Sequence, residues 1–197
     1  MPSSSHAEWR NIQDGPPLPD ITQGMDSRVV AKAPQNADWD PTNTGVDAGG
    51  CDIEEILTRI PHRYPFVLVD RLVQCVPMRS ARALKNVSRG EAFFDGGDFR
   101  CSHLPQMLVI EAMAQTCALL CSRSVAKPDE ALYFFAGIDN CRFWLGVAPG
   151  DQLVLEATIV RMSAVFGKLH ARALVADCLV AEADFIAMVA QQEERKT

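Results

Sequence analysis

Apolar and polar residues follow two different periods along this chain. The segment from Leu108 to Leu120 has apolar residues on almost every side of a 3.6-residue turn, which predicts a helix that is buried all round. The helix is expected to begin at Pro105 and to end near Lys127. Beyond this point apolar and polar residues alternate one by one, and this alternation predicts strands.

Three alternating segments follow the helix, at about residues 152–159, 168–175 and 181–187. Turn residues separate them, among them the Pro-Gly-Asp triplet at 149–151. The pattern therefore predicts that the second half of the domain is an antiparallel sheet.

A second group of elements is expected before the long helix. Asp52 can cap a short amphipathic helix over 53–60, and two strands are expected at about 66–76 and 81–87. Residues 88–103 are rich in Gly and Asp and predict an irregular loop. The predicted fold class is α+β, with an antiparallel sheet wrapped around one long buried helix. Open strand edges and a helix that one sheet covers only in part favour a dimer.

The two ends of the chain differ from the middle in composition. Residues 1–50 are rich in Pro, Ser, Asn, Asp and Gly and have no apolar run that could pack, so we expect a disordered extension. The folded domain is expected over 51–190, followed by a flexible charged tail over 191–197. The N-terminal segment lacks the apolar stretch of a signal peptide and is acidic, which favours a cytoplasmic location.

Charge and cysteine content exclude several classes of function. The net charge of -6 argues against a nucleic-acid partner. Seven cysteines are an odd number, and several lie in apolar segments, so they are interpreted as reduced core residues. Without paired Cys or His ligand spacing we expect no metal site. No apolar run reaches about 18 residues, so no membrane span is expected.

Glu111 is the residue that stands out for chemistry. It is an acidic side chain in the middle of the apolar helix segment. A carboxylate in such a place is costly to leave unpaired, so it is expected to be hydrogen-bonded or to carry a proton. Either state suits acid–base catalysis, and we interpret Glu111 as the leading catalytic candidate.

Several short motifs occur in one order along the chain. They are Pro-His-Arg-Tyr-Pro-Phe at 61–66 with Val-Leu-Val-Asp-Arg at 67–71, Phe-Phe at 93–94, Ile-Glu-Ala-Met-Ala-Gln at 110–115, and Tyr-Phe-Phe-Ala-Gly-Ile-Asp at 133–139. In this order and spacing the chain resembles the 3-hydroxyacyl-(acyl carrier protein) dehydratases of the hot-dog fold. The resemblance covers about residues 52–190.

The resemblance implies a fold, a substrate and a division of roles. It implies a homodimer with the active site at the subunit interface, a 3-hydroxyacyl chain carried on the phosphopantetheine of acyl carrier protein or coenzyme A, and no cofactor of the enzyme itself. In the family a loop histidine removes the C2 proton, and a glutamate from the other subunit's helix protonates the departing hydroxide. Glu111 matches the glutamate. The backbone N–H of Gln106 is placed at the helix start to hold the thioester oxygen. Gln115, one turn after Glu111, can hydrogen-bond Glu111 or the substrate.

The chain departs from the family pattern at the loop histidine. Counting back from the helix motif places Gly97 at that position. His103, later in the same loop, is the candidate replacement base, and Asp98 is a weaker one. His62 is interpreted as structural, and His170 as a solvated strand residue.

Three functions remain open at this stage. The first is a dehydratase, a hydro-lyase of fatty acid biosynthesis, in which Glu111 and His103 share the proton transfers. The second is a hot-dog thioesterase in which Glu111 activates water or attacks the thioester. The third is a non-catalytic homologue that binds acyl chains or assembles with partners.

Overall fold

The structure is a computed structural model, and it describes residues 49–94, 103–124, 131–163 and 165–191. The predicted disordered extension and the predicted charged tail lie almost entirely outside the described residues, so both stay predictions.

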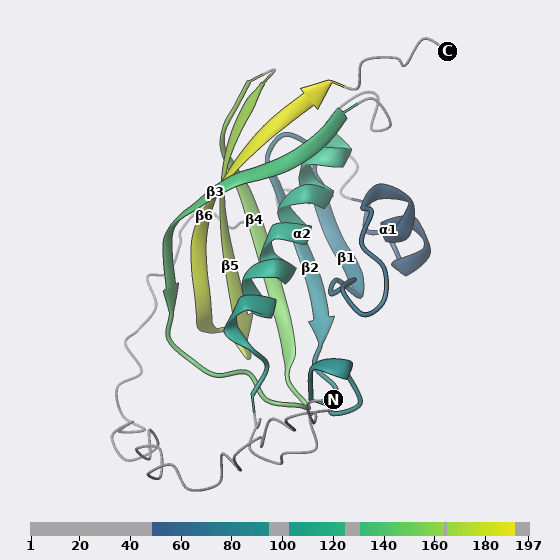
Figure 1. The fold of residues 1–197 in the computed structure, drawn as a ribbon, viewed down its shortest axis with the longest axis vertical. Helices are drawn as coiled ribbons and strands as arrows, with labels where there is room; N and C mark the ends of the chain where they lie inside the picture. Colours follow the sequence, from purple (N-terminus) through teal and green to yellow (C-terminus); the bar gives the residue numbers. More distant parts are fainter. Residues whose placement is uncertain (1–48, 95–102, 125–130, 164, 192–197) are drawn as a thin grey trace, which may run out of the picture. The chain divides into compact units, whose positions relative to one another are not determined.

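The described residues form an antiparallel sheet with helices on one face. In chain order the elements are α1 (Ile53–Arg59), β1 (Arg71–Val76), β2 (Ser80–Asn86), the short 3-10 helix η2 (Ala92–Phe94), α2 (Gln106–Ser124), β3 (Ala131–Phe143), β4 (Gln152–Met162), β5 (Phe166–Val175) and β6 (Cys178–Gln191). The six strands lie in the order β1-β2-β4-β5-β6-β3, and every neighbouring pair is antiparallel. Figure 1 shows α2 lying along the sheet. The predicted α+β fold class is confirmed.

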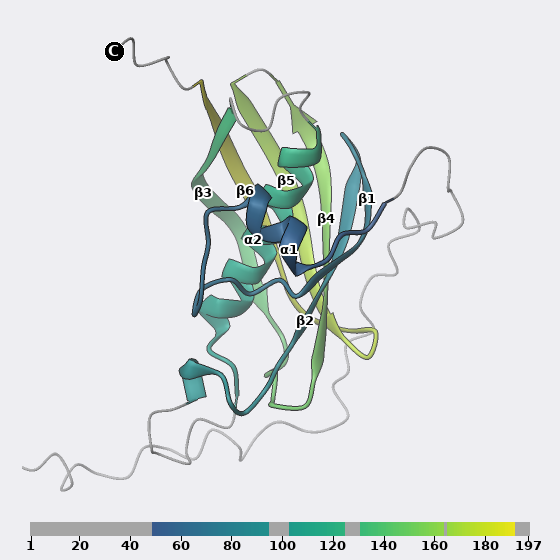
Figure 2. The ribbon, with the colours of Figure 1, turned by 90° about the vertical axis from the view of Figure 1, so that its right-hand side faces the viewer.

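The core lies between α2 and the inner face of the sheet. Figure 2 shows α1 and α2 on the same side of the strands. Met113 and Leu120 on α2 have no exposed surface, and neither has Phe185 on β6. The rings of Phe185 and Phe135 meet edge to face with centroids 5.5 Å apart. Each large apolar side chain buried in this way contributes roughly 1.5–3 kcal/mol relative to an exposed one.

One side of α2 is not covered by the sheet. Met107 is 69 % exposed, and Glu111 and Ala118 on the same side are partly exposed. The prediction that this helix is buried all round is therefore wrong for the single chain. The reason is geometric, because a sheet can shield only the helix side that faces it.

The observed strands differ from the predicted ones in two places, at the start of β1 and at β3. The strand expected from residue 66 begins only at Arg71 in β1. Residues 66–70 precede it as an irregular segment whose backbone groups bond elsewhere, as described below. The long strand β3 was missed altogether. Its register shifts twice against β6, between Phe135 and Gly137 and between Asp139 and Arg142, and such bulges break the alternation that reveals a strand.

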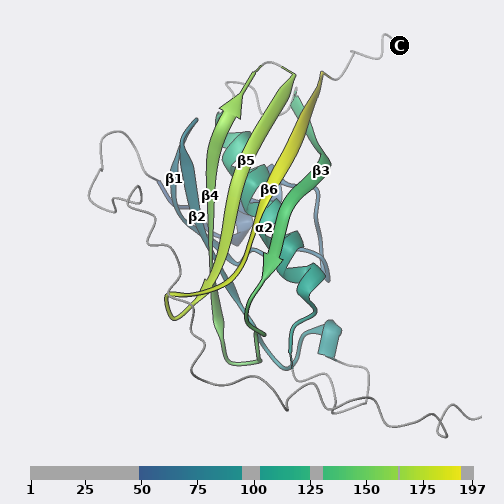
Figure 3. The ribbon, with the colours of Figure 1, turned by 90° about the vertical axis from the view of Figure 1, so that its left-hand side faces the viewer.

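The outer face of the sheet carries a row of alternating charges. Figure 3 views the sheet from the side opposite α2. Arg82, Glu156, Arg172, Glu182 and Arg142 are paired in turn across β2, β4, β5, β6 and β3. Within the row, Arg172 Nη2 donates to Glu156 Oε2 at 2.7 Å. Opposite charges on neighbouring strands support the register of the sheet.

His170 belongs to a hydrogen-bonded cluster beside this row. Its Nδ1 lies 2.9 Å from Asp184 Oδ1, and Lys168 and Asn140 also contact the Asp184 carboxylate. Burial raises the pKa of Asp184, but the hydrogen bonds from Asn140, His170 and Lys168 outweigh it and lower the pKa to about 2. His170 faces outward as expected and is partly exposed, and it is also paired across the sheet with Asp184, which the sequence did not predict.

Candidate active site

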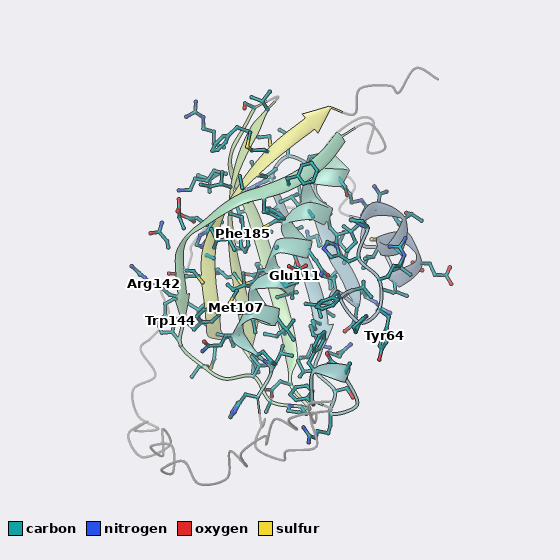
Figure 4. All side chains as sticks on the ribbon, viewed as in Figure 1. Tyr64, Met107, Glu111, Arg142, Trp144 and Phe185 are labelled. Atoms are coloured by element: carbon teal, nitrogen blue, oxygen red, sulfur yellow. The ribbon has the colours of Figure 1, made fainter. Side chains whose placement is uncertain are left out.

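Glu111 lies in the second turn of α2 and faces the loop that joins α1 to β1. Figure 4 shows its side chain on the side of the helix toward that loop. Its Oε1 accepts a hydrogen bond from Gln115 Nε2 at 2.8 Å and lies 3.2 Å from His62 Nε2. The side chain is 36 % exposed in the single chain. The expectation of a hydrogen-bonded carboxylate is confirmed, although the carboxylate is only partly buried.

Gln115 connects Glu111 to the segment before β1. Its Nε2 also donates to Phe66 O at 2.7 Å, and its Oε1 accepts from Leu68 N at 2.9 Å. These two bonds fix which end of the amide is the donor, so Gln115 can only donate to Glu111. The side chain is 1 % exposed. The expected hydrogen bond between Gln115 and Glu111 is therefore present.

The α1–β1 loop brings His62 to the same carboxylate. The loop is tightly bonded, since Arg63 Nη1 donates to Ile60 O and to His62 O, and Phe66 N donates to Arg63 O. It contains a cis peptide bond before Pro65. His62 was interpreted as structural from the sequence, and its contact with Glu111 was missed. The two residues are 49 positions apart, and no local pattern links them.

The chemistry of Glu111 depends on its second oxygen. Both polar contacts are made by Oε1, and among the described residues no hydrogen bond or ion pair engages Oε2. A carboxylate held at one oxygen and open at the other can accept or deliver a proton at the open oxygen. Glu111 therefore has the arrangement of an acid–base group.

Gln106 and His103 lie at the start of α2. Gln106 is the first residue of the helix, one residue after the expected start at Pro105, and the first backbone N–H groups of a helix have no partner within the helix. His103 lies just before it, and Leu104 N donates to Val147 O at 2.7 Å. A Cβ on Gly146 would lie 2.5 Å from His103 Cδ2, so the imidazole ring packs directly against Gly146 and a larger residue there would displace it.

The predicted site residues are thus only partly brought together. Glu111 and Gln115 are in direct contact, and His62 joins them. Gln106 is on the same helix, and in the described part of the chain the hydrogen bonds and ion pairs of Glu111 do not include His103. Gly97 and Asp98 fall in 95–102, outside the described residues.

The buried thiols of the described segments are unsuited to catalysis. Cys75, Cys117 and Cys121 are buried, and burial raises the pKa of Cys75 to about 11 and that of Cys121 to about 12. These thiols are poor nucleophiles near neutral pH. Within the described ranges no group of three or more His, Cys, Asp or Glu side chains could hold a metal ion. The helices of those ranges are too short or too polar to cross a membrane.

Comparisons with known proteins identify a family. Residues 60–184 match the FabA-like domain. The 3-hydroxyacyl-[acyl-carrier-protein] dehydratase FabZ of Albidiferax ferrireducens is 46 % identical over 140 residues, which are 70 % of this chain and 93 % of that protein. The protein of the same description from Nitrosospira multiformis is 44 % identical over 144 residues, or 72 % of this chain and 99 % of that one.

Solved structures share the fold at lower sequence identity. The dehydratase heterocomplex ApeI:P from Xenorhabdus doucetiae superposes with a TM-score of 0.58 at 19 % identity and covers 70 % of this chain and 91 % of that chain. The protein PH1136 from Pyrococcus horikoshii has a TM-score of 0.51 at 14 % identity and covers 66 % of this chain and 89 % of that chain. These similarities concern the fold alone.

Proposed function

Because the chain belongs to the FabA-like family that includes the FabZ dehydratases, we propose that it dehydrates a 3-hydroxyacyl thioester to the trans-2-enoyl thioester. We propose that the acyl chain arrives on the phosphopantetheine of acyl carrier protein or of coenzyme A, and that the reaction needs no cofactor. The names of the FabZ relatives specify acyl-carrier-protein substrates, which supports the first carrier.

One observation carries this proposal, namely the state of the Glu111 carboxylate. Oε1 is held by a donor from Gln115, while Oε2 is bound by no described residue. The side chain is 36 % exposed, so a substrate could reach Oε2 without first displacing a described protein group. Glu111 lies on the side of α2 that the sheet does not cover, and this position supports a role for Oε2 in proton transfer with a substrate.

The proposed reaction needs two proton transfers. A base takes the C2 proton, the electron pair of that C–H bond forms the C2–C3 double bond, and the C3 hydroxyl leaves as water after receiving a proton. We assign the protonation of the hydroxyl to Glu111 and the removal of the C2 proton to His103. The backbone N–H of Gln106 would stabilise the negative charge that develops on the thioester oxygen.

We also propose that the chain forms a homodimer through the free edge of β3. β3 is the last strand of the described sheet, so one side of its backbone has no strand partner there. Apolar side chains gather along this edge and the nearby helix side: Ile138 is 43 % exposed, and Met107 is more exposed still. Pairing two β3 edges would satisfy both backbones and cover these side chains.

Sedimentation velocity tests the dimer. We expect a species of twice the 21.6 kDa chain mass. Replacing Ile138 with lysine should shift the protein to monomer, because a charge would be buried at the proposed interface. The matched control is Val160→Lys, which places the same charge on an exposed apolar position of β4 and should leave the dimer intact. A wild-type monomer at tens of micromolar would contradict the proposal.

The assay for function supplies 3-hydroxyacyl thioesters of acyl carrier protein and of coenzyme A, and saturated acyl thioesters in parallel. Enoyl product and free thiol are followed separately, with and without a chelator. We expect enoyl product, no thiol release, and no effect of the chelator. Thiol release would instead indicate a thioesterase, and tight binding without either product would indicate a non-catalytic homologue.

The same assay tests His103. If His103 is the base, His103→Ala should lower the rate of enoyl formation by about a hundred-fold or more. The melting temperature of the variant must be measured as well, because the ring packs against Gly146. An unchanged rate would remove His103 from the mechanism and leave the proton transfers to Glu111.

A further inference from the structure

We propose that His62 is a positioning residue for Glu111, and that its Nε2–H donates to Glu111 Oε1 so that Oε2 is presented to the substrate. The proposal rests on the proposed acid–base function of Glu111. It starts from the 3.2 Å distance between His62 Nε2 and Glu111 Oε1, which is within reach of a hydrogen bond.

The first argument concerns Gln115, which also contacts Glu111 Oε1 and does so as a hydrogen-bond donor. Gln115 Oε1 is committed to Leu68 N, so its Nε2 must be the group that donates to Glu111. Gln115 holds the carboxylate from the C-terminal side of the helix. His62 approaches from a loop outside the helix, so the two contacts come from different directions. Two donors on one oxygen fix the rotation of the carboxylate better than one donor does.

The second argument concerns the other ring nitrogen of His62. Nδ1 is buried, and among the described residues it has no hydrogen-bond partner. An N–H at this position would be a buried donor without an acceptor, which is costly, whereas a bare lone pair there costs less. The proton of the neutral ring therefore belongs on Nε2, the nitrogen that faces Glu111. The environment of Nδ1 thus selects the tautomer in which His62 can donate to Oε1.

The consequence is a carboxylate prepared before the substrate arrives. With Oε1 held from two directions, Oε2 is aimed without the cost of ordering the side chain during the reaction. The α1–β1 loop would then do more than connect two elements, because its hydrogen bonds hold His62 in place. His62 acts through Glu111 and need not touch the substrate.

Two substitutions separate this role from a packing role. The amide nitrogen of glutamine reaches about where histidine Nε2 lies, while that of asparagine reaches about where Nδ1 lies. We expect His62→Gln to keep kcat within about ten-fold of the wild type, and His62→Asn to lower kcat by about a hundred-fold with little change in KM. Equal kcat values for the two variants, both folded, would overturn the proposal.

A spectroscopic measurement tests the hydrogen bond without relying on activity. Two-bond nitrogen–proton spectra of the ¹⁵N-labelled imidazole rings report the tautomer, and the His62 signals are identified by their absence in His62→Gln among the four histidines of the chain. We expect the His62 ring to carry a proton on Nε2. An Nδ1–H tautomer would overturn the proposal. If the wild type forms no enoyl product, the proposed function fails, and the spectra still decide whether His62 donates to Glu111.

Discussion

Replacing Glu111 with glutamine is expected to lower the rate of enoyl formation by about a hundred- to ten-thousand-fold, the usual cost of losing an acid–base group. Glutamine keeps the size of the side chain and retains a carbonyl oxygen that accepts from His62 and Gln115 at the position of Oε1. It cannot take up or deliver a proton at the other end. The measurement is kcat with the carrier-bound 3-hydroxyacyl substrate.

The control for this experiment is another glutamate in the same domain. Glu54→Gln on the exposed side of α1 removes the same charge and should leave kcat unchanged. The melting temperature of Glu111→Gln should stay near that of the wild type, since the contacts of Oε1 are kept. Undiminished dehydration by the folded variant would mean that Glu111 is not the acid–base group.

Replacing Gln115 with leucine should lower the free energy of unfolding by about 2–4 kcal/mol. Leucine removes three hydrogen bonds at once and leaves Leu68 N–H as a donor without its partner next to a buried side chain. The loss is larger than for an ordinary hydrogen bond, because the unpaired group cannot reach water. Urea denaturation followed by circular dichroism measures the effect.

Thr116→Val is the matched control, because Thr116 is also a buried polar residue of α2. Its hydroxyl donates only to Ala112 O, a carbonyl of its own helix. Removing this hydroxyl leaves no donor unsatisfied, so the cost should stay below about 1 kcal/mol. Similar losses for the two variants would show that Gln115 contributes by volume and not by its connections to the α1–β1 loop.

Much of the fold could be predicted because its signals are local. Asp52 caps α1 by accepting from Glu55 N, as its position before an amphipathic segment indicated. The strands β4 and β5 keep the simple alternation that reveals them for most of their length. Residues 66–70 misled the prediction because their apolar side chains resemble a strand, while the backbone of Phe66 and Leu68 bonds to Gln115 far along the chain.

The candidate site was predictable only in part, because some of its contacts join residues that are far apart in the chain. Glu111 is conspicuous as a lone acidic residue in an apolar helix, and Gln115 lies one turn away on the same side. The contact of His62 with Glu111 is set by the fold, and the sequence around His62 suggested only a structural role. In the proposed dimer, the distance from His103 to a substrate depends on how two chains meet, which no pattern within one chain describes.

The row of alternating charges across the outer face also restricts how copies of this chain can meet. A second molecule stacking flat on that face would have to remove water from the exposed charges of the row, above all from Arg142, whose side chain is 68 % exposed, and would regain little in return. The outer face is therefore unfavourable for close packing with a second copy of the chain. Contact at the β3 edge beside Ile138 is favoured instead. The charges on the outer face would thus protect the chain from forming layered aggregates, and they leave the β3 edge accessible.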